Sequence, residues 1–412
     1  MGGQTKISQW ARKISSQGVG YSVVELNDVR HVLAAAVPRR GSSLAEQTWD
    51  ALQTIRQLSE DEGVRGAIVS QSVFLAGPQY LEECQAIIRE FYGPEIPATT
   101  YVFQPPCEGK LVAIEALGVG RQQDGVQILR ISENLVIARH SGVSWIHCAH
   151  ITPATDSPRV YDRTTSAFHR MAAMLLRAGV GFERVIRTWL YLGDIVGKEG
   201  DTQRYMEMNR ARSDFYQNIH FQAGRRPPGF NPVVYPASTG IGTEGRDIIM
   251  SCIALDTGRE DIVSMPLENP LQRSAFAYSP CYGLKSPKFC RAMALSCGPF
   301  ATILISGTAS ITNEETQHVG DVVGQTHQTL DNIEALISPE NLARHGMPGL
   351  GTSLEGLACA RVYVKHKEDF PAVREVCVRR LGELPTVYAV ADVCRPELLV
   401  EIEGIAFCRR ED

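Results

Sequence analysis

The spacing of apolar and polar positions repeats between the two ends of the chain. Segments QTWDALQTI, from Gln47, and QTHQTLDNI, from Gln325, share Gln, Thr, Leu and Ile at the same offsets, and each predicts an amphipathic helix. Both are followed by an alternating strand, a second helix, a proline-led strand and a last apolar strand. These elements read VSQSVFLA, QYLEECQAIIREFYG, IPATTYVFQPP and LVAIEALGV in the first region, and LACARVYVK, EDFPAVREVCVRRLG, LPTVYAVADVC and LVEIEGIAF in the second.

The middle of the chain has the same order of elements with weaker identity. Its helices and strands read DRTTSAFHRMAAMLLRAGV, VIRTWLYLGDI, DTQRYMEMNRARSDFYQNI, VVYPASTGI and RDIIMSCIALDT. We therefore predict an α+β chain of three tandem units, each with strands on one face and two helices on the other. The predicted parts are a degenerate first unit (1–130), a second unit (131–258), a connecting segment (259–284) and a third unit (285–412). Three independent domains are the alternative, but no low-complexity linker separates the units.

Two acidic residues interrupt the last apolar strand. Glu401 and Glu403 are two residues apart, so alternation puts both carboxylates on one face of the strand. A buried charge is costly unless it is paired or protonated. Glu403 aligns with Glu115 of the first unit, which indicates a shared structural role, whereas Glu401 aligns with Ala113. Glu401 is therefore the candidate for chemistry carried out by one unit only; its alternative is a structural glutamate.

Composition limits the classes of partner. The 412 residues carry a net charge of -5 and contain no basic run, so we expect neither nucleic acid nor membrane as a partner. No apolar stretch reaches the ~20 residues that a membrane helix needs, and the N-terminus lacks the apolar core of a secretion signal. The 11 cysteines, an odd number without a CxxC pair, favour reduced thiols and a cytoplasmic location.

Three motifs are weighed and set aside. GIGTEG, at 240–245, matches GxGxxG, but a strand pattern follows it where a dinucleotide site needs a helix. His147 and His150 would face opposite sides of a strand, which disfavours a metal site. Cys377 and Cys408 have no histidine arranged to activate them as nucleophiles. We predict no metal and no organic cofactor.

The order of elements resembles the RidA (YjgF/YER057c) fold, whose members form trimers with clefts between subunits. The resemblance implies a single-chain pseudo-trimer that acts as a monomer. Simple RidA enzymes hydrolyse enamines and imines with an arginine in a PARST-like strand. The matching stretches here are PATTY, PASTG and LPTVY, without that arginine, which argues against imine hydrolysis.

From Arg187 to the C-terminus the chain is similar to the chorismatases, which remove the enolpyruvyl group of chorismate. The resemblance rests on pieces in the same order, which read RTWLYLGDI, RYMEMNRAR, PLENPLQRSAFAYSPCYGLKSPKFCRA, ISGTASI with HVGDVVGQT, and ADVCRPELLVEIEG. It implies an enzyme that takes chorismate and releases pyruvate. The family has two RidA-like units, so a full third unit is a departure.

A pocket for chorismate, a dianion, needs cationic and hydroxyl donors, and arginine binds carboxylates with two parallel hydrogen bonds. The cationic candidates are Arg187, Arg204, Arg212, Lys285 and Arg291. Tyr191, Tyr205, Tyr278 and Tyr282 are candidates for stacking or hydrogen bonding. The alternatives are a solvated charge for each cation and a core aromatic residue for each tyrosine.

Cleavage of the vinyl ether requires an acid that protonates its methylene carbon near neutral pH. Burial and nearby negative charge raise the pKa of a glutamate, so we predict that Glu401 is this general acid. Within the family, a glycine in the SGTAS strand and a cysteine before the glutamate mark enzymes that form 3-hydroxybenzoate. Gly307 and Cys394 occupy these places and favour that product. Hydrolysis to a dihydroxycyclohexadiene carboxylate, a RidA-type hydrolase and a non-catalytic ligand-binding protein remain alternatives.

Overall fold

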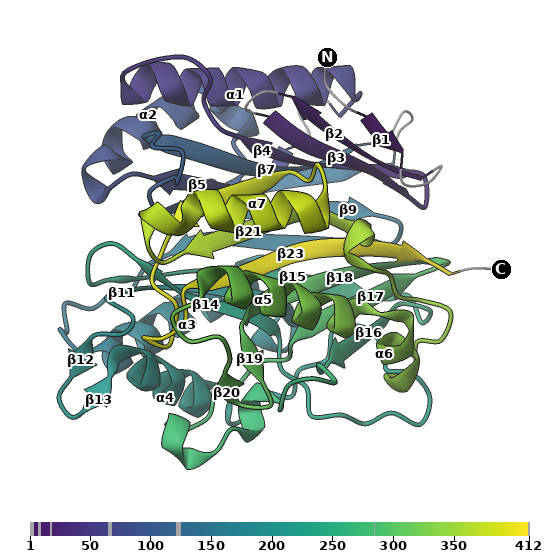
Figure 1. Cartoon of the computed structure of the whole chain (residues 1–412). Coiled ribbons are helices and arrows are strands. Elements are labelled where there is room, and N and C mark those ends of the chain that lie inside the picture. The colour runs from purple at the N-terminus through teal and green to yellow at the C-terminus, as the bar shows by residue number, and fades with distance from the viewer. Residues whose placement is uncertain are drawn as a thin grey trace.

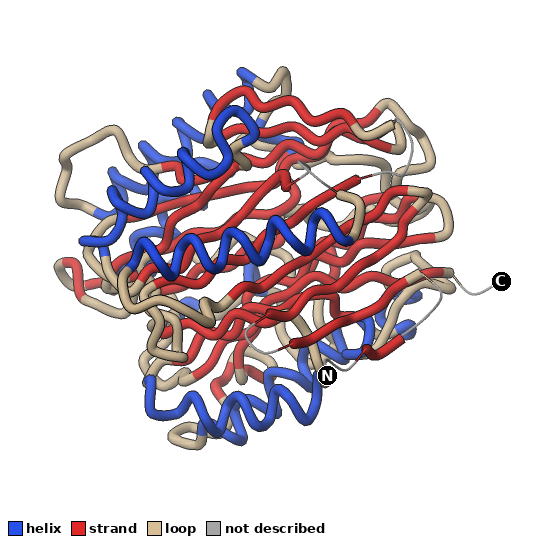
Figure 2. Tube along the Cα trace, turned by 90° about the horizontal axis from the view of Figure 1, so that it is seen from above, coloured by secondary structure: helices blue, strands red, loops and turns tan. Residues whose placement is uncertain are grey.

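The fold is mixed α+β, with three main sheets inside and the longer helices around them (Figures 1 and 2). The structure, a computed structural model, describes residues 4–6, 10–16, 19–64, 68–120, 125–283 and 285–410. None of the helices in these ranges is both long and apolar enough to cross a membrane.

The first sheet is built from the N-terminal third of the chain. Its strand order is β1 (Gln4–Lys6), β2 (Ala11–Ser16), β3 (Val19–Leu26), β4 (Val29–Ala36), β7 (Val112–Gly120), β5 (Ile68–Leu75) and β6 (Ala98–Val102). Helices α1 (Leu44–Asp61) and α2 (Leu81–Tyr92) accompany it. Ser43 and Glu46 form a capping box that starts α1, since each side chain accepts a hydrogen bond from the other's backbone N–H.

The second sheet follows directly along the chain. Its order is β8 (Gln127–Ser132), β9 (Leu135–His140), β10 (Val143–Ile151), β15 (Ile248–Thr257), β11 (Val185–Gly193) and β14 (Ala237–Thr243). Its helices are α3 (Val160–Arg177) and α4 (Arg204–Tyr216). A small ribbon, β12 (Lys198–Glu199) with β13 (Thr202–Gln203), precedes α4.

The third sheet contains the C-terminal strand. Its order is β16 (Val263–Leu267), β17 (Ala292–Cys297), β18 (Phe300–Ala309), β23 (Val400–Arg409), β21 (Leu357–Val364) and β22 (Thr386–Val390). Its helices are α5 (Val322–Ile337), α6 (Pro339–Arg344) and α7 (Phe370–Leu381), and β19 (Ile311–Thr312) pairs with β20 (Glu315–Thr316). Short 3-10 turns complete the chain: η1 (Pro78–Tyr80), η2 (Gly93–Glu95), η3 (Phe182–Arg184), η4 (Ala275–Ala277), η5 (Pro280–Tyr282), η6 (Leu354–Gly356) and η7 (Lys367–Asp369).

The three sheets share one topology. In each, a central strand (β7, β15 or β23) lies antiparallel between two neighbours, and one neighbour pairs in parallel with the last strand of the order. Helices α1, α3 and α5 pack on the equivalent strands. Gln47 in α1 and Gln325 in α5 make the same contact, since their side-chain oxygens accept the backbone N–H of Leu111 and of Leu399. The residues that carry the sequence repeat therefore also join helix to strand.

The faces of the sheets that lack helices meet in a shared core. Phe74, Tyr191 and Tyr363 come from equivalent positions of β5, β11 and β21, and all three are fully buried in one apolar cluster. Opposite them on the central strands lie Ala113, Ile249 and Glu401. The position that is apolar in the first two sheets is thus acidic in the third.

Residues 259–284, which the sequence predicts to be a connecting segment, include a strand of the third sheet. Residues Val263–Leu267 form strand β16, which pairs antiparallel with β17 at the edge of the third sheet. Pro266 lies within it, and an edge strand tolerates a proline because one side of its ladder is unpaired.

Candidate active site

Glu401 lies near the start of β23, beside a bulge in the neighbouring strand β18. The register shifts between Ile305 and Thr308, so Ser306 and Gly307 together oppose Glu403. The Gly307 N–H therefore leaves the ladder and donates to the Thr239 hydroxyl of β14 at 2.9 Å. A Cβ at position 307 would overlap the Glu401 carboxyl oxygen, so only glycine leaves room for the acid here.

The Glu401 side chain borders a cavity of about 240 Å³ between the second and third sheets. Gln203, Tyr205, Met206, Arg212, Ser238 and Gly240 line it from the second sheet and α4. Tyr278, Cys281, Tyr282, Pro287, Phe289 and Arg291 line it from the segment before β17. Gly307, Ala309, Ile311, Cys394, Arg395, Pro396, Glu397 and Glu401 complete it.

Three arginines in this lining have only neutral partners among the described residues. Arg212 donates to the Ser238 hydroxyl at 3.3 Å and to the Asn209 amide oxygen. Arg291 donates to the Tyr278 hydroxyl at 2.6 Å and to the Arg273 carbonyl oxygen at 2.8 Å. Within the described ranges, the Nε groups of Arg212 and Arg291 have no hydrogen-bond partner. These residues are 1% and 3% exposed, and within the described ranges neither guanidinium group has an ion-pair partner within 4.0 Å, although the buried Glu268 interacts electrostatically with Arg291.

The third cation, Arg395, lies on the loop before β23. It donates to the Glu314 carbonyl oxygen at 2.8 Å, and its guanidinium carbon is 4.1 Å from the centre of the Tyr282 ring. Phe289 lies between the other two arginines, with its ring centre 5.6 Å from the guanidinium of Arg212 and 5.4 Å from that of Arg291. The cavity thus combines aromatic walls with positive charge.

Burial raises the pKa of Glu401 to about 8, and the neighbouring Glu403 carboxylate adds to the rise, whereas Arg187 and Arg291 oppose it. Among the described residues, no group donates a hydrogen bond to the Glu401 carboxyl, which is 4% exposed. An acid with this pKa is largely protonated at neutral pH and can act as a proton donor. With Glu401 neutral, the three arginines outweigh Glu397 and leave the lining with a net charge of +2.

Glu403, two residues further on, is a fully paired carboxylate. Its oxygens accept hydrogen bonds from Arg187 at 2.5 Å, from the Trp189 indole at 2.9 Å and from Arg361 at 3.1 Å. The Tyr363 hydroxyl donates at 3.0 Å, and Thr239 also donates. Burial alone would raise the pKa of Glu403, but the two arginines, aided by Thr239 and Trp189, hold it below its ordinary value.

Of the predicted site residues, the cavity brings together eight. These are Tyr205, Arg212, Tyr278, Tyr282, Arg291, Gly307, Cys394 and Glu401. Burial raises the pKa of the Cys394 thiol to about 12, so this sulfur is a neutral wall rather than a nucleophile.

The other four predicted residues lie outside this lining. Arg187 is bound to Glu403, and Tyr191 accepts a hydrogen bond from Arg361 in the shared core. Arg204 is fixed by the Gly193 carbonyl oxygen at 3.0 Å and by Glu199 at 3.1 Å. Lys285 pairs with Asp214 at the surface. The partners of these residues account for them as parts of the scaffold.

Several residues that line the cavity were not predicted from the sequence. Arg395 stands between a cysteine and a proline, and Ser238 is a small residue of an ordinary strand. Arg395 could have been found from its place beside Cys394, seven residues before the acid. Phe289 could have been found only from the fold, in which its ring lies between Arg212 and Arg291.

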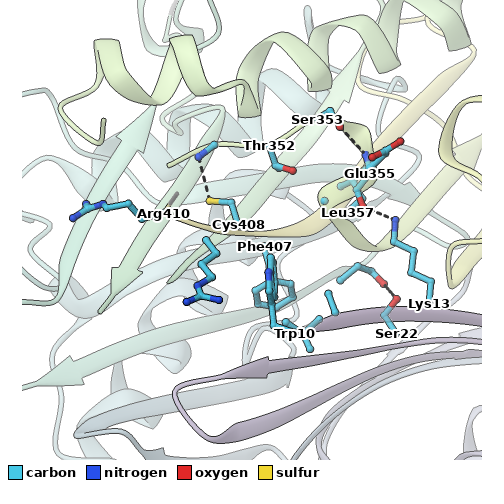
Figure 3. Close-up of a pocket in the computed structure, with 16 residues that line it drawn as sticks. Trp10, Lys13, Ser22, Thr352, Ser353, Glu355, Leu357, Phe407, Cys408 and Arg410 are labelled. Carbon is cyan, nitrogen blue, oxygen red and sulfur yellow. Dashed lines mark hydrogen bonds between the residues drawn. The ribbon is translucent and has the colours of Figure 1, made fainter. Parts of the chain in front are cut away.

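A second cavity, of about 500 Å³, lies between strands β2 and β3 and the segment 351–358 (Figure 3). Lys13 borders it and donates to the Glu355 carbonyl oxygen at 2.7 Å. Glu355 is the one carboxylic acid among the described lining residues, and it is exposed. This cavity therefore lacks a buried acid comparable with Glu401.

Comparison with known proteins places the cavity in a family context. Residues 124–254 match the family model described as chorismatase FkbO/Hyg5-like, N-terminal. The chain is 35% identical over 272 residues to a 3-hydroxybenzoate synthase of Streptomyces hygroscopicus, covering 65% of this chain and 74% of that protein. It is 38% identical over 230 residues to a chorismatase of Streptomyces rapamycinicus, covering 55% and 65%.

A solved structure extends the likeness of fold to nearly the whole chain. The crystal structure of a chorismatase matches with a TM-score of 0.65 and 24% identity, over 91% of this chain and 98% of that one. The fold and the arginine-lined cavity with its buried acid define an α+β enzyme for a small anionic substrate. Together with the sequence relatives, they show that the chain belongs to the chorismatase family.

Proposed function

We propose that this protein cleaves the enolpyruvyl ether of chorismate and releases pyruvate and 3-hydroxybenzoate, with Glu401 as the general acid. The observation that carries the proposal is the buried Glu401, whose pKa is raised by burial to about 8, in the same lining as Arg212 and Arg291, two buried cations with no ion-pair partner within 4.0 Å among the described residues. The names of the relatives, 3-hydroxybenzoate synthase and chorismatase, point to the same substrate.

Charge complementarity supports a dianionic substrate. A lining with a net charge of +2 would be neutralised by the two carboxylates of chorismate. Arg212 and Arg291 would each bind one carboxylate, because guanidinium groups bind this group in a bidentate manner. The rings of Phe289, Tyr278 and Tyr282 would hold the substrate's six-membered ring between them.

The chemical step begins with a proton from Glu401. Transfer of this proton to the vinyl methylene carbon converts the ether into an oxocarbenium-like centre. The bond between the ring carbon and the ether oxygen then breaks, and this oxygen leaves as the keto oxygen of pyruvate. The Glu403 carboxylate supports this step because its charge disfavours a second negative charge on Glu401 before the substrate is bound.

The product depends on what attacks next. We infer that the substrate's own C4 hydroxyl, rather than water, attacks the ring carbon that pyruvate leaves. The proton that the substrate then loses returns to Glu401 as the ring becomes aromatic 3-hydroxybenzoate. Gly307 and Cys394 support this assignment, since both small residues line the cavity next to Glu401. Chorismate and the sum of pyruvate and 3-hydroxybenzoate have the same atoms, so no water is consumed.

An imine or enamine hydrolase fits less well. The PASTG strand carries Ser238 and no arginine, and the nearby Arg212 reaches the site from helix α4 instead. No observation in the cavity favours imine chemistry over cleavage of the ether.

The direct test is release of pyruvate from chorismate, followed with lactate dehydrogenase and NADH. We expect turnover by the wild-type protein and a loss of roughly 10²–10⁴-fold in kcat for Glu401→Gln, the usual contribution of a general acid. Glu375→Gln, which removes an exposed carboxylate on α7, is the control and should keep full activity. Absence of pyruvate with wild-type protein would refute the proposal.

Chromatography of the same reaction identifies the second product. We expect 3-hydroxybenzoate in an amount equal to pyruvate. A dihydroxycyclohexadiene carboxylate in its place would keep Glu401 as the acid but would contradict attack by the C4 hydroxyl.

We also propose that the chain is a single-chain pseudo-trimer of RidA-like units that functions as a monomer, as the shared topology of the sheets suggests. The second unit would begin with β8 at Gln127 rather than at 131, and the third with β16 at Val263 rather than at 285, because these strands belong to the second and third sheets. Only the junction of the second and third units would be active, since Ala113 and Ile249 replace the acid in the other two units.

A further inference from the structure

Arg361 of β21 connects all three sheets at their junction. Its Nε and Nη2 groups donate to Glu115 of the first sheet at 3.0 and 2.6 Å, and Nη2 also donates to Ser72 at 2.9 Å. Its Nη1 group donates to the Tyr191 hydroxyl of the second sheet at 3.0 Å and to Glu403 at 3.1 Å. All five N–H groups of the guanidinium therefore have an acceptor.

We propose that Glu115, which belongs to the first sheet, is a positioning residue for catalysis: it neutralises Arg361, so that the charge of Glu403 continues to keep a proton on Glu401. The inference rests on the proposed role of Glu401 as the acid. It also gives the N-terminal unit a part in the reaction, although that unit contributes no described residue to the lining of the cavity.

The positions of the acids support this role. Glu115 lies opposite Ser72 in the first sheet, and Glu403 lies opposite Arg361 at the equivalent place in the third. The second sheet has Ser251 there, opposite Trp189. The first sheet has thus lost the acid that aligns with Glu401 but keeps the acid that reaches Arg361.

The charges at the junction are balanced. Arg187 and Arg361 face Glu115 and Glu403, so two cations meet two anions in a largely buried cluster. Removal of the Glu115 charge would leave the remaining cluster of Arg187, Arg361 and Glu403 with one net positive charge. Because charges interact strongly at low dielectric, this excess would favour the ionised form of Glu401.

Other charged or titratable groups also face Glu401, from every element packed around it. They are Glu403 on β23, Tyr363 on β21 directly opposite Glu401, Arg187 on β11, Tyr205 and Arg212 on α4, Tyr278 and Tyr282 beside the 3-10 turns, Arg291 before β17, and Cys394, Arg395 and Glu397 on the loop. The hydrogen bonds and ion pairs of the described chain link Glu115 to none of these directly, only to Arg361. A change at position 115 therefore tests the route through Arg361.

The experiment measures the protonation of Glu401 in the folded protein without any substrate. Urea unfolding is followed from pH 6 to pH 10 for wild type, Glu401→Gln, Glu115→Gln and the double variant. Since Glu401 has a raised folded pKa, its contribution to stability falls as pH rises and levels off above that pKa. For wild type and for Glu115→Gln, the free energy of unfolding is compared with that of the same protein carrying Glu401→Gln. The pH above which this difference becomes constant reports the ionisation of Glu401.

We expect this pH to be lower by roughly half a unit to one unit when Glu115 is replaced by Gln. The alkaline limb of kcat for pyruvate release should move by the same amount. Glu25→Gln removes another paired acid of the first sheet, the partner of Arg30, and should shift neither curve. An unchanged levelling-off in the Glu115→Gln background would overturn the inference.

Two further variants keep the test decisive. If Glu115→Gln does not fold, Glu115→Asp retains the charge but withdraws it by one methylene, and a smaller shift in the same direction is expected. Ser72→Ala removes a neutral contact to Arg361 and should lower stability without moving the pH at which Glu401 ionises. Failure of wild-type protein to release pyruvate would refute the proposed function, whereas the unfolding curves would still decide the coupling.

Discussion

Glu401 and Glu403 have the same side chain, but their surroundings shift the two pKa values in opposite directions. They are two residues apart on β23 and are buried to a similar degree. Glu403 has two arginines, an indole and two hydroxyls as partners, and it is held as a carboxylate. Glu401 has no hydrogen-bond donor in the described chain and holds its proton. The sequence predicted this division from their alignment with Ala113 and Glu115.

The pH dependence of activity follows from the raised pKa of Glu401. The proposed mechanism requires the protonated acid, so we expect kcat for pyruvate release to fall as pH rises through about 8. The same group affects stability: its favourable contribution is complete below the unfolded pKa of about 4.5 and is lost as pH rises through 8. A pH–rate profile together with urea unfolding at pH 9 will check both effects, and Glu401→Gln should be more stable than wild type at that pH.

Gly307 provides a second test at the scale of one residue. A methyl group at this position would overlap the Glu401 carboxyl oxygen and would come to 3.0 Å from the Thr239 methyl carbon. We expect Gly307→Ala to reduce kcat at least tenfold, because Glu401 must move away from the position where its proton is delivered. Gly258→Ala, where an added Cβ meets nothing within 4 Å and the backbone does not have a positive φ, is a control for the change itself, and steady-state kinetics of pyruvate release would compare the two.

At the scale of elements, the sequence repeat predicted the helices and strands nearest the centre of the first and third sheets. Helices α1, α5, α2 and α7, and strands β5, β21, β7 and β23, occur where the two periodicities place them. The repeat does not include β1–β4, and β16 lies in the segment predicted as a connection. Strands β1 and β16 are at the edges of their sheets, and Pro266 weakens the pattern of β16. Strand β4 lies inside its sheet and is buried at almost every position, so it shows a continuous apolar run rather than alternation.

The candidate site was predictable only in part, because contacts between distant segments decide which side chains reach the cavity. Arg187 and Arg291 look alike in the sequence, since both stand among apolar or aromatic neighbours. In the fold, Arg187 points to Glu403 whereas Arg291 borders the cavity. Contacts between distant segments decide which arginine pairs with a carboxylate of the protein. Arg187 and Glu403, for example, are more than 200 residues apart in the chain.

The glutamines of α1 and α5 offer a matched comparison at this scale. Gln325 accepts the Leu399 N–H and donates to the Glu397 carbonyl oxygen at 2.9 Å, so it holds the loop that leads to Glu401. Gln47 makes the equivalent contact to Leu111, far from the acid. We expect Gln325→Leu and Gln47→Leu each to cost about 1–3 kcal/mol, the usual penalty of an unsatisfied buried group.

The two variants should differ in catalysis. Gln325→Leu should lower kcat because the loop before β23 loses its anchor, whereas Gln47→Leu should leave kcat near the wild-type value. Unfolding in urea and pyruvate release, measured side by side, give both numbers. Equal losses of activity in the two variants would argue against a specific role for the α5 contact.

At the scale of the whole molecule, three sheets in one chain already enclose the faces that lack helices. The shared core contains Phe74, Tyr191 and Tyr363, one from each sheet. We therefore expect a monomer in solution, with a mass near 45.3 kDa by size-exclusion chromatography with light scattering. A species of three times that mass would contradict the proposed pseudo-trimer.

Joining the three sheets in one polypeptide has an energetic consequence for the acid. In an assembly of identical subunits, a glutamate introduced on the central strand would occur three times around the axis. Each copy would resist ionisation, and the assembly would lose stability threefold above neutral pH. Here the cost falls on a single position, since alanine and isoleucine occupy the other two. A single chain can therefore carry this destabilising group once, whereas a symmetric trimer of identical subunits would carry it three times.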